Sequence, residues 1–256
     1  MKDYKKGGKI TGKLLIEGNL ILTDNLEVEE EIEVTGYIYC AGYSIKAGDW
    51  IKAGSWIEAG SWIKAGSWIE AGSWIKAGDW IEAGDWIKAG SWIKAGDWIK
   101  AGDWIKAGSS IEAGSWIKAG SWIEAGDWIK AGSSIEAGGS IEAGSWIKAG
   151  DWIDAGDWIK AGSSIEAGDW IEAKLGITAF LHITCKGTLN AGLRIIAGVC
   201  NWREITDTDR TVTCGKLESG EVVGILVETG VTEIEELTLA EVCKRLGKTV
   251  KIVKEA

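Results

Sequence analysis

The side chains of this 256-residue chain that could do chemistry form no catalytic pattern. The single histidine, His182, lies in the apolar segment 180–183, where a core or surface role is commoner than catalysis. Neither a CxxC spacing nor a neighbouring histidine marks a metal site or a thiol nucleophile among the cysteines Cys40, Cys185, Cys200, Cys214 and Cys243. Phosphate-loop and nucleotide-binding motifs are absent as well. We therefore expect a protein with no catalytic residues, no metal and no cofactor.

The residues best suited to binding are tryptophans and aspartates that recur at fixed positions. Of the 18 Trp, 17 stand directly before an Ile, where stacked rings or an apolar contact surface would result. Nine aspartates stand directly before such a Trp: Asp49, Asp79, Asp85, Asp97, Asp103, Asp127, Asp151, Asp157 and Asp169. Calcium-binding solenoids hold their ions with aspartates in a GGxGxDxUx unit, and that unit is absent from this repeat.

A six-residue repeat positions all of these side chains. Ile recurs at every sixth residue from Ile45 to Ile171, which makes 22 hexads of the form Ile-[Lys/Glu]-Ala-Gly-[Ser/Asp]-Trp. A period of six does not match the 3.6-residue helical turn, whereas it is a multiple of the two-residue period of a strand. We expect Ile and Ala to face inward from short strands, and the following Gly to form a corner at positive φ.

The charges after each Ile indicate how many hexads make one coil. Residues one coil apart lie about 4.8 Å from each other on neighbouring strands, so opposite charges should pair. Two hexads per coil place opposite charges together in 6 of 20 pairs, and three hexads per coil do so in 11 of 19. The sequence therefore predicts coils of 18 residues and an all-β, parallel β-solenoid.

This repeat resembles the hexapeptide repeat of left-handed parallel β-helices, in which an inward aliphatic residue is followed three positions later by a turn Gly or Asn and four positions later by a small residue. Ile45, Gly48 and the Ser of Ser55 or Ser61 fit those places in their hexads. The resemblance implies a left-handed triangular coil. Hexapeptide acyltransferases of that fold rely on a catalytic His, and a lone His182 argues against their activity here. The array and the segments 185–203 and 213–218 also resemble uncharacterised Trp-rich repeat proteins of Firmicutes and their mobile elements, which carry no assigned activity.

The predicted organisation has three parts. Residues 1–44 form irregular first coils or a cap, with a slip between Cys40 and Ile45, and residues 45–198 form the hexapeptide-repeat solenoid. The rod as a whole has about ten coils and is roughly 45–50 Å long. Residues 199–256 form a small α+β cap or association module. Its helix begins with the capping-box pattern at 238–241, and the apolar residues at helical spacing are Leu239, Val242, Cys243 and Leu246.

Strand parity places the tryptophans on the outside, and a coil of three hexads arranges them in columns. Two interpretations are open: an intramolecular ladder covering the sheet faces, or an adhesive surface for self-association, a protein target or sugar rings. The aspartates share the parity of Ile, so we expect them at corners, with their oxygens accepting backbone N–H groups. The candidate surface consists of Trp50, Trp68, Trp86, Trp104 and Trp122; Trp62, Trp80, Trp98 and Trp116; and Trp56, Trp74 and Trp92.

The predicted function is that of a non-enzymatic structural or interaction protein whose partner is a second copy or another protein. The net charge of −10 argues against direct binding of nucleic acid. The same charge supports an alternative function, that of an acidic DNA mimic that inhibits a DNA-binding enzyme. Without an export signal or an apolar run long enough to span a bilayer, we expect a cytoplasmic protein that does not enter membranes.

Overall fold

Each hexad forms one short strand and one corner. In the computed structural model, which describes residues 2–4, 8–198 and 206–229, a typical strand is β8 (Ile45–Ala47). Its Ile and Ala are buried and its Lys is partly exposed, the alternation expected when one strand face meets a core. The next three residues turn the chain through a corner to the following strand.

Three strands make one coil, and successive coils stack in parallel to give three faces. The first face is a 13-stranded sheet: β1 (Lys2–Tyr4), β4 (Gly18–Leu22), β7 (Ile38–Cys40), β10 (Ile57–Ala59), β13 (Ile75–Ala77), β16 (Ile93–Ala95), β19 (Ile111–Ala113), β22 (Ile129–Ala131), β25 (Ile147–Ala149), β28 (Ile165–Ala167), β31 (Ile183–Cys185), β33 (Thr211–Cys214) and β35 (Ile225–Glu228).

The second and third faces share their last two strands, β32 (Thr188–Ala197) and β34 (Lys216–Val223), and so form one 22-stranded sheet. The second face starts with β2 (Gly8–Ile10), β5 (Leu26–Val28), β8, β11 (Ile63–Ala65), β14 (Ile81–Ala83), β17 (Ile99–Ala101), β20 (Ile117–Ala119), β23 (Ile135–Ala137), β26 (Ile153–Ala155) and β29 (Ile171–Ala173). The third starts with β3 (Leu14–Ile16), β6 (Ile32–Val34), β9 (Ile51–Ala53), β12 (Ile69–Ala71), β15 (Trp86–Ala89), β18 (Trp104–Ala107), β21 (Trp122–Ala125), β24 (Ile141–Ala143), β27 (Trp158–Ala161) and β30 (Gly176–Ala179).

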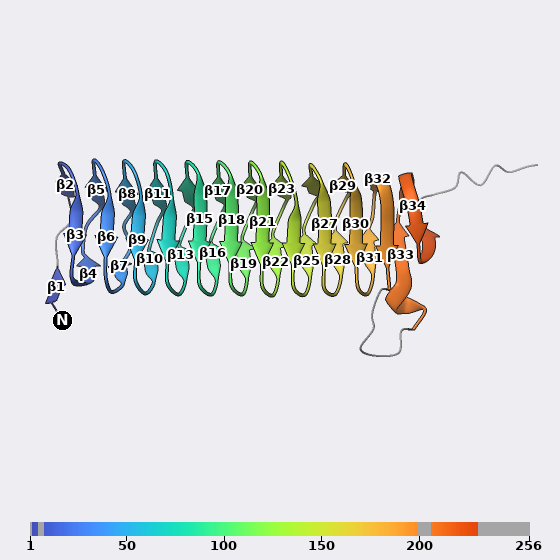
Figure 1. Cartoon of the computed structure of the whole chain (residues 1–256), viewed down its shortest axis with the longest axis horizontal. Helices are drawn as coiled ribbons and strands as arrows, with labels where there is room; N and C mark the ends of the chain where they lie inside the picture. The colour runs from blue at the N-terminus through green and yellow to red at the C-terminus, as the bar shows by residue number, and fades with distance from the viewer. Residues whose placement is uncertain (1, 5–7, 199–205, 230–256) are drawn as a thin grey trace, which may run out of the picture.

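The strand register confirms the predicted coil of 18 residues. Ile69 pairs with Ile87, and Ile87 pairs with Ile105, so identical hexad positions lie above one another. The result is a straight rod, seen from the side in Figure 1. With 13 strands on its first face and a strand spacing near 4.8 Å, the described rod is roughly 55 Å long, which exceeds the predicted length. Strand register sets the pitch and not the hand, so the left hand stays a prediction from the resemblance.

Columns of Ile fill the interior of the rod. Every repeat Ile from Ile45 to Ile171 is at most 1% exposed, and the Ala that follows each of them is also buried. Burying an Ile side chain contributes about 2–3 kcal/mol of hydrophobic stabilisation, so the three Ile and three Ala of each coil all add to the stability of the core. Adjacent coils share that core through direct Ile–Ile stacking.

The corner glycines have a different role from the predicted one. Positive φ angles among the described glycines occur only at Gly8, Gly12, Gly18, Gly42, Gly198, Gly220 and Gly224, and none of these belongs to the perfect repeat. The repeat glycines instead permit close approach between coils, because a Cβ on Gly84 would lie 1.8 Å from the carbonyl oxygen of Gly66. The corners of the perfect repeat therefore carry Gly because the backbone of the preceding coil fills the space that a side chain would need.

The first coils contain the predicted slip. Ile45, Ile51 and Ile57 pair with Leu26, Ile32 and Ile38, which are 19 residues earlier instead of 18. The extra residue is taken up in the turn after Cys40, where Gly42 has a φ of 76° and the Tyr43 N–H donates to the Cys40 carbonyl. Upstream of this turn the aliphatic pairs continue the same core.

The stacking does not stop at Gly198, where we expected the solenoid to end. β33 pairs with β31, β34 with β32, and β35 with β33, so residues 211–228 add strands to all three faces. These strands and the short 3-10 helix η1 (Thr208–Arg210) are the described part of the predicted α+β module. Its predicted helix and the residues Leu239, Val242, Cys243 and Leu246 lie outside the described residues. The division into three domains stays a prediction.

Candidate functional site

The repeat tryptophans form stacked columns along the corners of the rod. Consecutive rings lie one coil apart, with centroids 4.6–5.1 Å apart and planes within 6° of parallel. Ladder 1 contains Trp50, Trp68, Trp86, Trp104 and Trp122; ladder 2 contains Trp62, Trp80, Trp98 and Trp116; ladder 3 contains Trp56, Trp74 and Trp92. The structure thus brings together every residue of the predicted surface as intramolecular stacks. Their role in binding stays a prediction.

The backbone produces this stacking. In most coils the N–H of an Ile donates to the carbonyl of the Trp one coil later, as between Ile51 and Trp68 at 2.9 Å, so the rings have the same spacing as the strands. That spacing falls within the range that aromatic pairs prefer. Ring faces are covered by neighbouring rings, while the repeat tryptophans stay partly exposed and Trp158 reaches 38% exposure. The ladders therefore present ring edges to the surroundings.

Serine interrupts each ladder without changing the backbone. Ser110, Ser134, Ser140 and Ser164 stand at Trp positions. The Ile117 N–H donates to the Ser134 carbonyl at 2.9 Å, and the Ile99 N–H donates to the Trp116 carbonyl at 3.0 Å. At Ser134 a hollow of about 250 Å³ lies between Trp116 and Trp152. A coil can consequently form without its indole, and a missing ring leaves a gap in the ladder.

Lys and Glu form a second set of ladders on the flat faces. Ion pairs join residues one coil apart, for example Lys64 to Glu82 and Lys76 to Glu58, each at 2.8 Å. Glu112 accepts hydrogen bonds from Lys94 and Lys130, and the Lys94 bond is the main cause that lowers the pKa of this carboxyl. These pairs match the charge pattern from which the coil length was predicted.

The nine repeat aspartates lie at the corners, as predicted, and all are exposed. The corner reverses the strand parity, so the side chain after Gly points outward although it shares the parity of Ile. Among the described residues none of these nine carboxylates accepts a backbone N–H; instead Asp127 and Asp151 accept hydrogen bonds from the hydroxyls of Ser109 and Ser133. The corner backbone itself bonds to the preceding coil, as from the Ser67 N–H to the Asp49 carbonyl at 2.6 Å.

The described cysteines are buried thiols. Cys40, Cys185 and Cys214 are free, and burial raises the pKa of Cys40 to about 11 and that of Cys185 to about 12. A thiol is a poor nucleophile while it remains protonated, so these side chains act as small apolar residues of the core. Cys200 and Cys243 lie outside the described residues.

His182 occupies a corner position that Trp fills in most coils. Its Nε2 lies 3.6 Å from Oε1 of Glu166, which also binds Lys148. Within the described part of the chain, no group of three or more His, Cys, Asp or Glu side chains is placed to hold a metal ion.

One charge cluster escaped the sequence reasoning. Asp154 stands between Glu136 and Glu172 on the second face, with a carboxylate one coil away on each side. Burial, and then the charges of Glu172 and Glu136, raise the pKa of the Asp154 carboxyl. The acidic residues at 136, 154 and 172 are visible in the sequence at a spacing of 18. Counting opposite-charge pairs over the whole repeat does not single out this run of three like charges.

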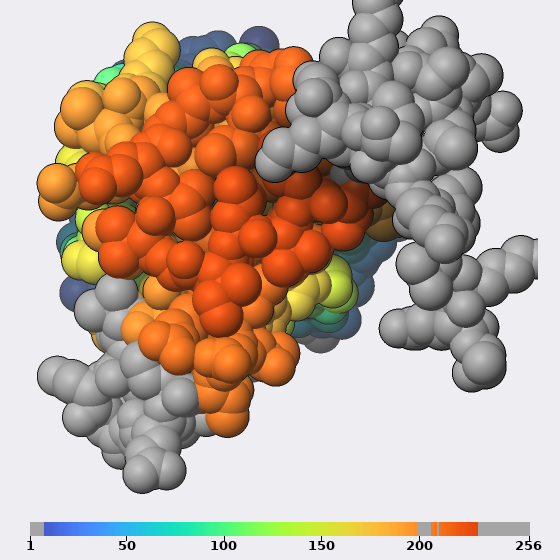
Figure 2. All heavy atoms as spheres, turned by 90° about the vertical axis from the view of Figure 1, so that its right-hand side faces the viewer, coloured from blue at the N-terminus to red at the C-terminus, as the bar shows by residue number. Residues whose placement is uncertain are grey.

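The two ends of the rod expose parts of the core. The partly buried apolar residues that pack against the core are Ile10 and Leu14 in the first coil, and Leu217 and Val222 in the last. Beyond them Val223, Ile225, Leu226 and Val227 are exposed on the final strands, at the end that faces the viewer in Figure 2. Sequence reasoning missed this surface because it placed the end of the solenoid at Gly198.

No protein-family model, no curated protein and no solved structure matches the chain. The likeness to hexapeptide-repeat proteins and to repeat proteins of Firmicutes therefore stays a prediction.

Of the helical structure in the described residues, none is both long and apolar enough to span a membrane.

Proposed function

We propose that this chain is a non-enzymatic structural protein: a rigid rod that presents Trp and Lys/Glu ladders and associates with further copies of itself. The open ends of the stacked coils carry the self-association, because both end coils leave apolar residues next to the core only partly buried. The Trp ladders support a display role over a catalytic one, because rows of partly exposed indole edges repeat over most of the solenoid. Extended apolar surface of this kind is typical of interaction sites. A reducing, cytoplasmic setting belongs to the proposal, and the free thiols of Cys40, Cys185 and Cys214 support it.

The coil ends favour a second copy as the partner. All strands run parallel, so the first coil of one copy can continue the sheet after the last coil of another. Such stacking would bury Ile10 and Leu14 against Leu217 and Val222, the residues that the rod leaves partly exposed. A head-to-tail contact that does not close into a ring builds a filament.

Light scattering across a concentration series tests the proposal. We expect the molar mass of the intact chain to rise above that of a monomer with concentration. The double substitution Val223→Lys and Leu226→Lys changes exposed residues of the last coil and should leave a monomer. A monomer at every concentration for the intact chain would overturn self-association.

A matched triple variant separates the sides of the rod from its ends. Trp68→Ser, Trp86→Ser and Trp104→Ser introduce the residue that ladders already accept at Ser110 and Ser134, so the rod should remain folded by circular dichroism. End-to-end association predicts that this variant still assembles. Loss of assembly in this variant alone would place the contact on the Trp ladders, and collapse of the fold would contradict an outward position for Trp.

A second candidate, the acidic DNA mimic, rests on the corner aspartates. In the perfect repeat 12 Lys stand against 19 acidic residues, a net charge of −7, and the nine exposed corner aspartates outnumber that excess. Competition with duplex DNA for a DNA-binding enzyme would support this candidate if Asp→Asn changes at the corners abolish it. The absence of competition at low salt, where charge effects are strongest, would dismiss it.

A further inference from the structure

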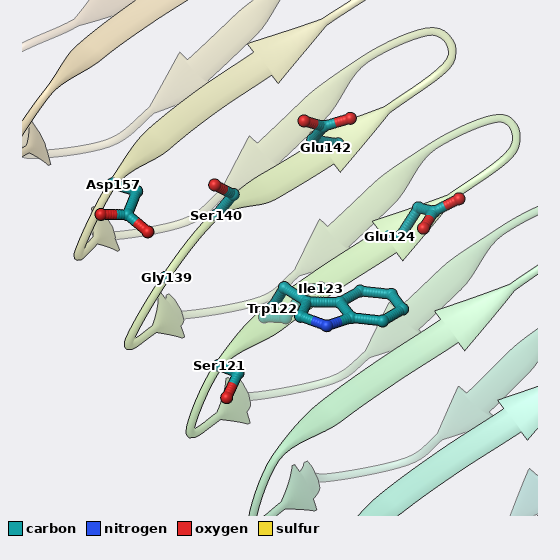
Figure 3. A pocket seen from close by; sticks show the side chains of 8 residues that line it. All are labelled: Ser121, Trp122, Ile123, Glu124, Gly139, Ser140, Glu142 and Asp157. Carbon is teal, nitrogen blue, oxygen red and sulfur yellow. The ribbon is translucent and has the colours of Figure 1, made fainter.

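Ladder 1 ends in a hollow that has the chemistry of a ligand site. Trp122 is stacked on Trp104 on one side, while Ser140 stands one coil further on, where the next indole would lie. The hollow beside Trp122 measures about 350 Å³ and is lined also by Glu124, Glu142 and Asp157. Figure 3 shows the Trp122 ring with both glutamates beyond the same edge, and Ser140 in the next coil.

The hollow has room for a flat ring. Ladder rings lie 4.6–5.1 Å apart, so each coil accommodates one indole, and Ser140 removes one such ring without moving the backbone: the Ile123 N–H donates to the Ser140 carbonyl at 3.0 Å. Gly139 widens this corner, because the other Trp-free corners of the repeat carry Ser at that position. The hollows beside Ser134 and Ser164 are smaller, at about 250 and 260 Å³.

The charge around the hollow is negative. Glu124 and Glu142 are direct partners on neighbouring strands. Lys106 neutralises Glu124 at 2.9 Å, whereas Glu142 takes part in no ion pair of the described residues, although Lys160 is its strand partner on the far side. Asp157 adds a third carboxylate at the rim. The Nζ atom of Lys106 lies 5.7 Å from the Trp122 ring centroid, which shows that this indole already attracts a cation.

We propose that this hollow, the Ser140 slot, binds a planar aromatic cation the size of two fused rings. The ring would stack on the free face of Trp122 in place of the missing indole, and its positive charge would face Glu142. Stacking and a cation–π contact supply attraction, and the uncompensated carboxylate selects the cation over a neutral ring of the same shape.

Calorimetric titration with 1-methylquinolinium tests the proposal. We expect one site per chain, and we expect Ser140→Trp to abolish binding because the restored indole fills the slot. Ser134→Trp is the matched control, since it fills a different gap with the same residue and should leave binding unchanged. Equal loss in both variants, or binding that survives Ser140→Trp, would overturn the assignment to this slot.

Charge variants keep the test decisive should Ser140→Trp fail to fold. Glu142→Lys retains the repeat, because Lys106 and Lys160 occupy the same strand position in nearby coils. It should weaken 1-methylquinolinium binding by at least about tenfold, and Glu142→Gln by about threefold. Neutral quinoline, titrated at pH 8, should bind more weakly than the cation and respond to neither change. Equal affinity for the two probes would contradict a site selective for cations.

Discussion

The Ile ladders and the Trp ladders share one period and one strand spacing, yet they differ in tolerance. Ile stacks on Ile through the whole interior with at most 1% exposure, and no other residue takes its place between 45 and 171. Trp stacks on Trp with the same regularity at the corners, but serine replaces it at four of the corners. The backbone forms the same hydrogen bond between coils whether the corner carries Trp or Ser.

This difference shows that the buried Ile residues hold each coil together, whereas the Trp residues mainly determine its surface. An Ile removed from the interior leaves a void that no solvent or neighbour fills well. A Trp removed from a corner leaves an open hollow that water can enter. We therefore expect the stability of the rod to depend on Ile at every coil and on Trp only in part.

The largest effect is expected for Ile105→Ala in the middle of the rod. Ile105 is fully buried between Ile87 and Ile123, so the substitution should lower the free energy of unfolding by about 2–5 kcal/mol. Urea unfolding followed by circular dichroism measures this loss. A loss below that of the adjacent Trp substitution described next would break the distinction between the two ladders.

A smaller effect is expected for Trp104→Ser, one residue earlier on the same strand. It removes two ring contacts, to Trp86 and to Trp122, and should cost about 1–2 kcal/mol while the coil stays intact. Hydrogen exchange at the amides of Ile87 and Ile105, which are partners on neighbouring strands, reports whether that coil is preserved. Loss of protection throughout the rod would mean that Trp is part of the core.

The smallest change in stability is expected at the outward strand positions, which belong to neither the Ile nor the Trp ladders. Asp154→Asn should raise the unfolding free energy at pH 7 by about 0.5–1 kcal/mol, because it removes a charge held between Glu136 and Glu172. The pKa of Asp154 is raised on folding, so the ionised form opposes folding and the penalty disappears as the pH falls through that pKa. The advantage of the Asn variant should therefore vanish below about pH 4.

Glu166→Gln is the control of opposite sign. The hydrogen bond from Lys148 lowers the pKa of Glu166, so its contribution to stability is present above the ordinary pKa of Glu and is lost as the pH falls through the lowered value. This variant should be less stable than the intact chain at pH 7 and equal to it in acid. The same pH dependence in both variants would contradict the assignment of the two carboxyls.

Most of the architecture could be predicted from the sequence because it follows from a regular six-residue repeat. The spacing of Ile fixes the strands, the charges fix three strands per coil, and the outward columns of Trp follow from both. The role of Gly84 could not be predicted in the same way, because the need for Gly there comes from the backbone of the preceding coil and not from its own φ angle. Local patterns do not report contacts between coils.

The coil ends and the Ser140 slot were hidden for a related reason. Beyond Gly198 the hexad disappears, yet β33 and β35 still pair in parallel, since a stacked edge accepts any strand of suitable length and polarity. The slot depends on which residues meet across coils, namely Trp122, Ser140 and Glu142. The sequence shows each of these residues, but it does not show that they line one hollow.

The register of identical hexads also determines what a change in chain length would do. Deleting 18 residues from the perfect repeat removes one whole coil and leaves every downstream column in its place. Deleting six residues keeps Ile above Ile but moves each downstream strand to the adjacent face, so that Lys, Glu, Trp and Ser meet new neighbours. The core would be indifferent to such a change, while every surface ladder would be cut and spliced to another. The arrangement of side chains on the surface is therefore the property of this protein most sensitive to the number of hexads.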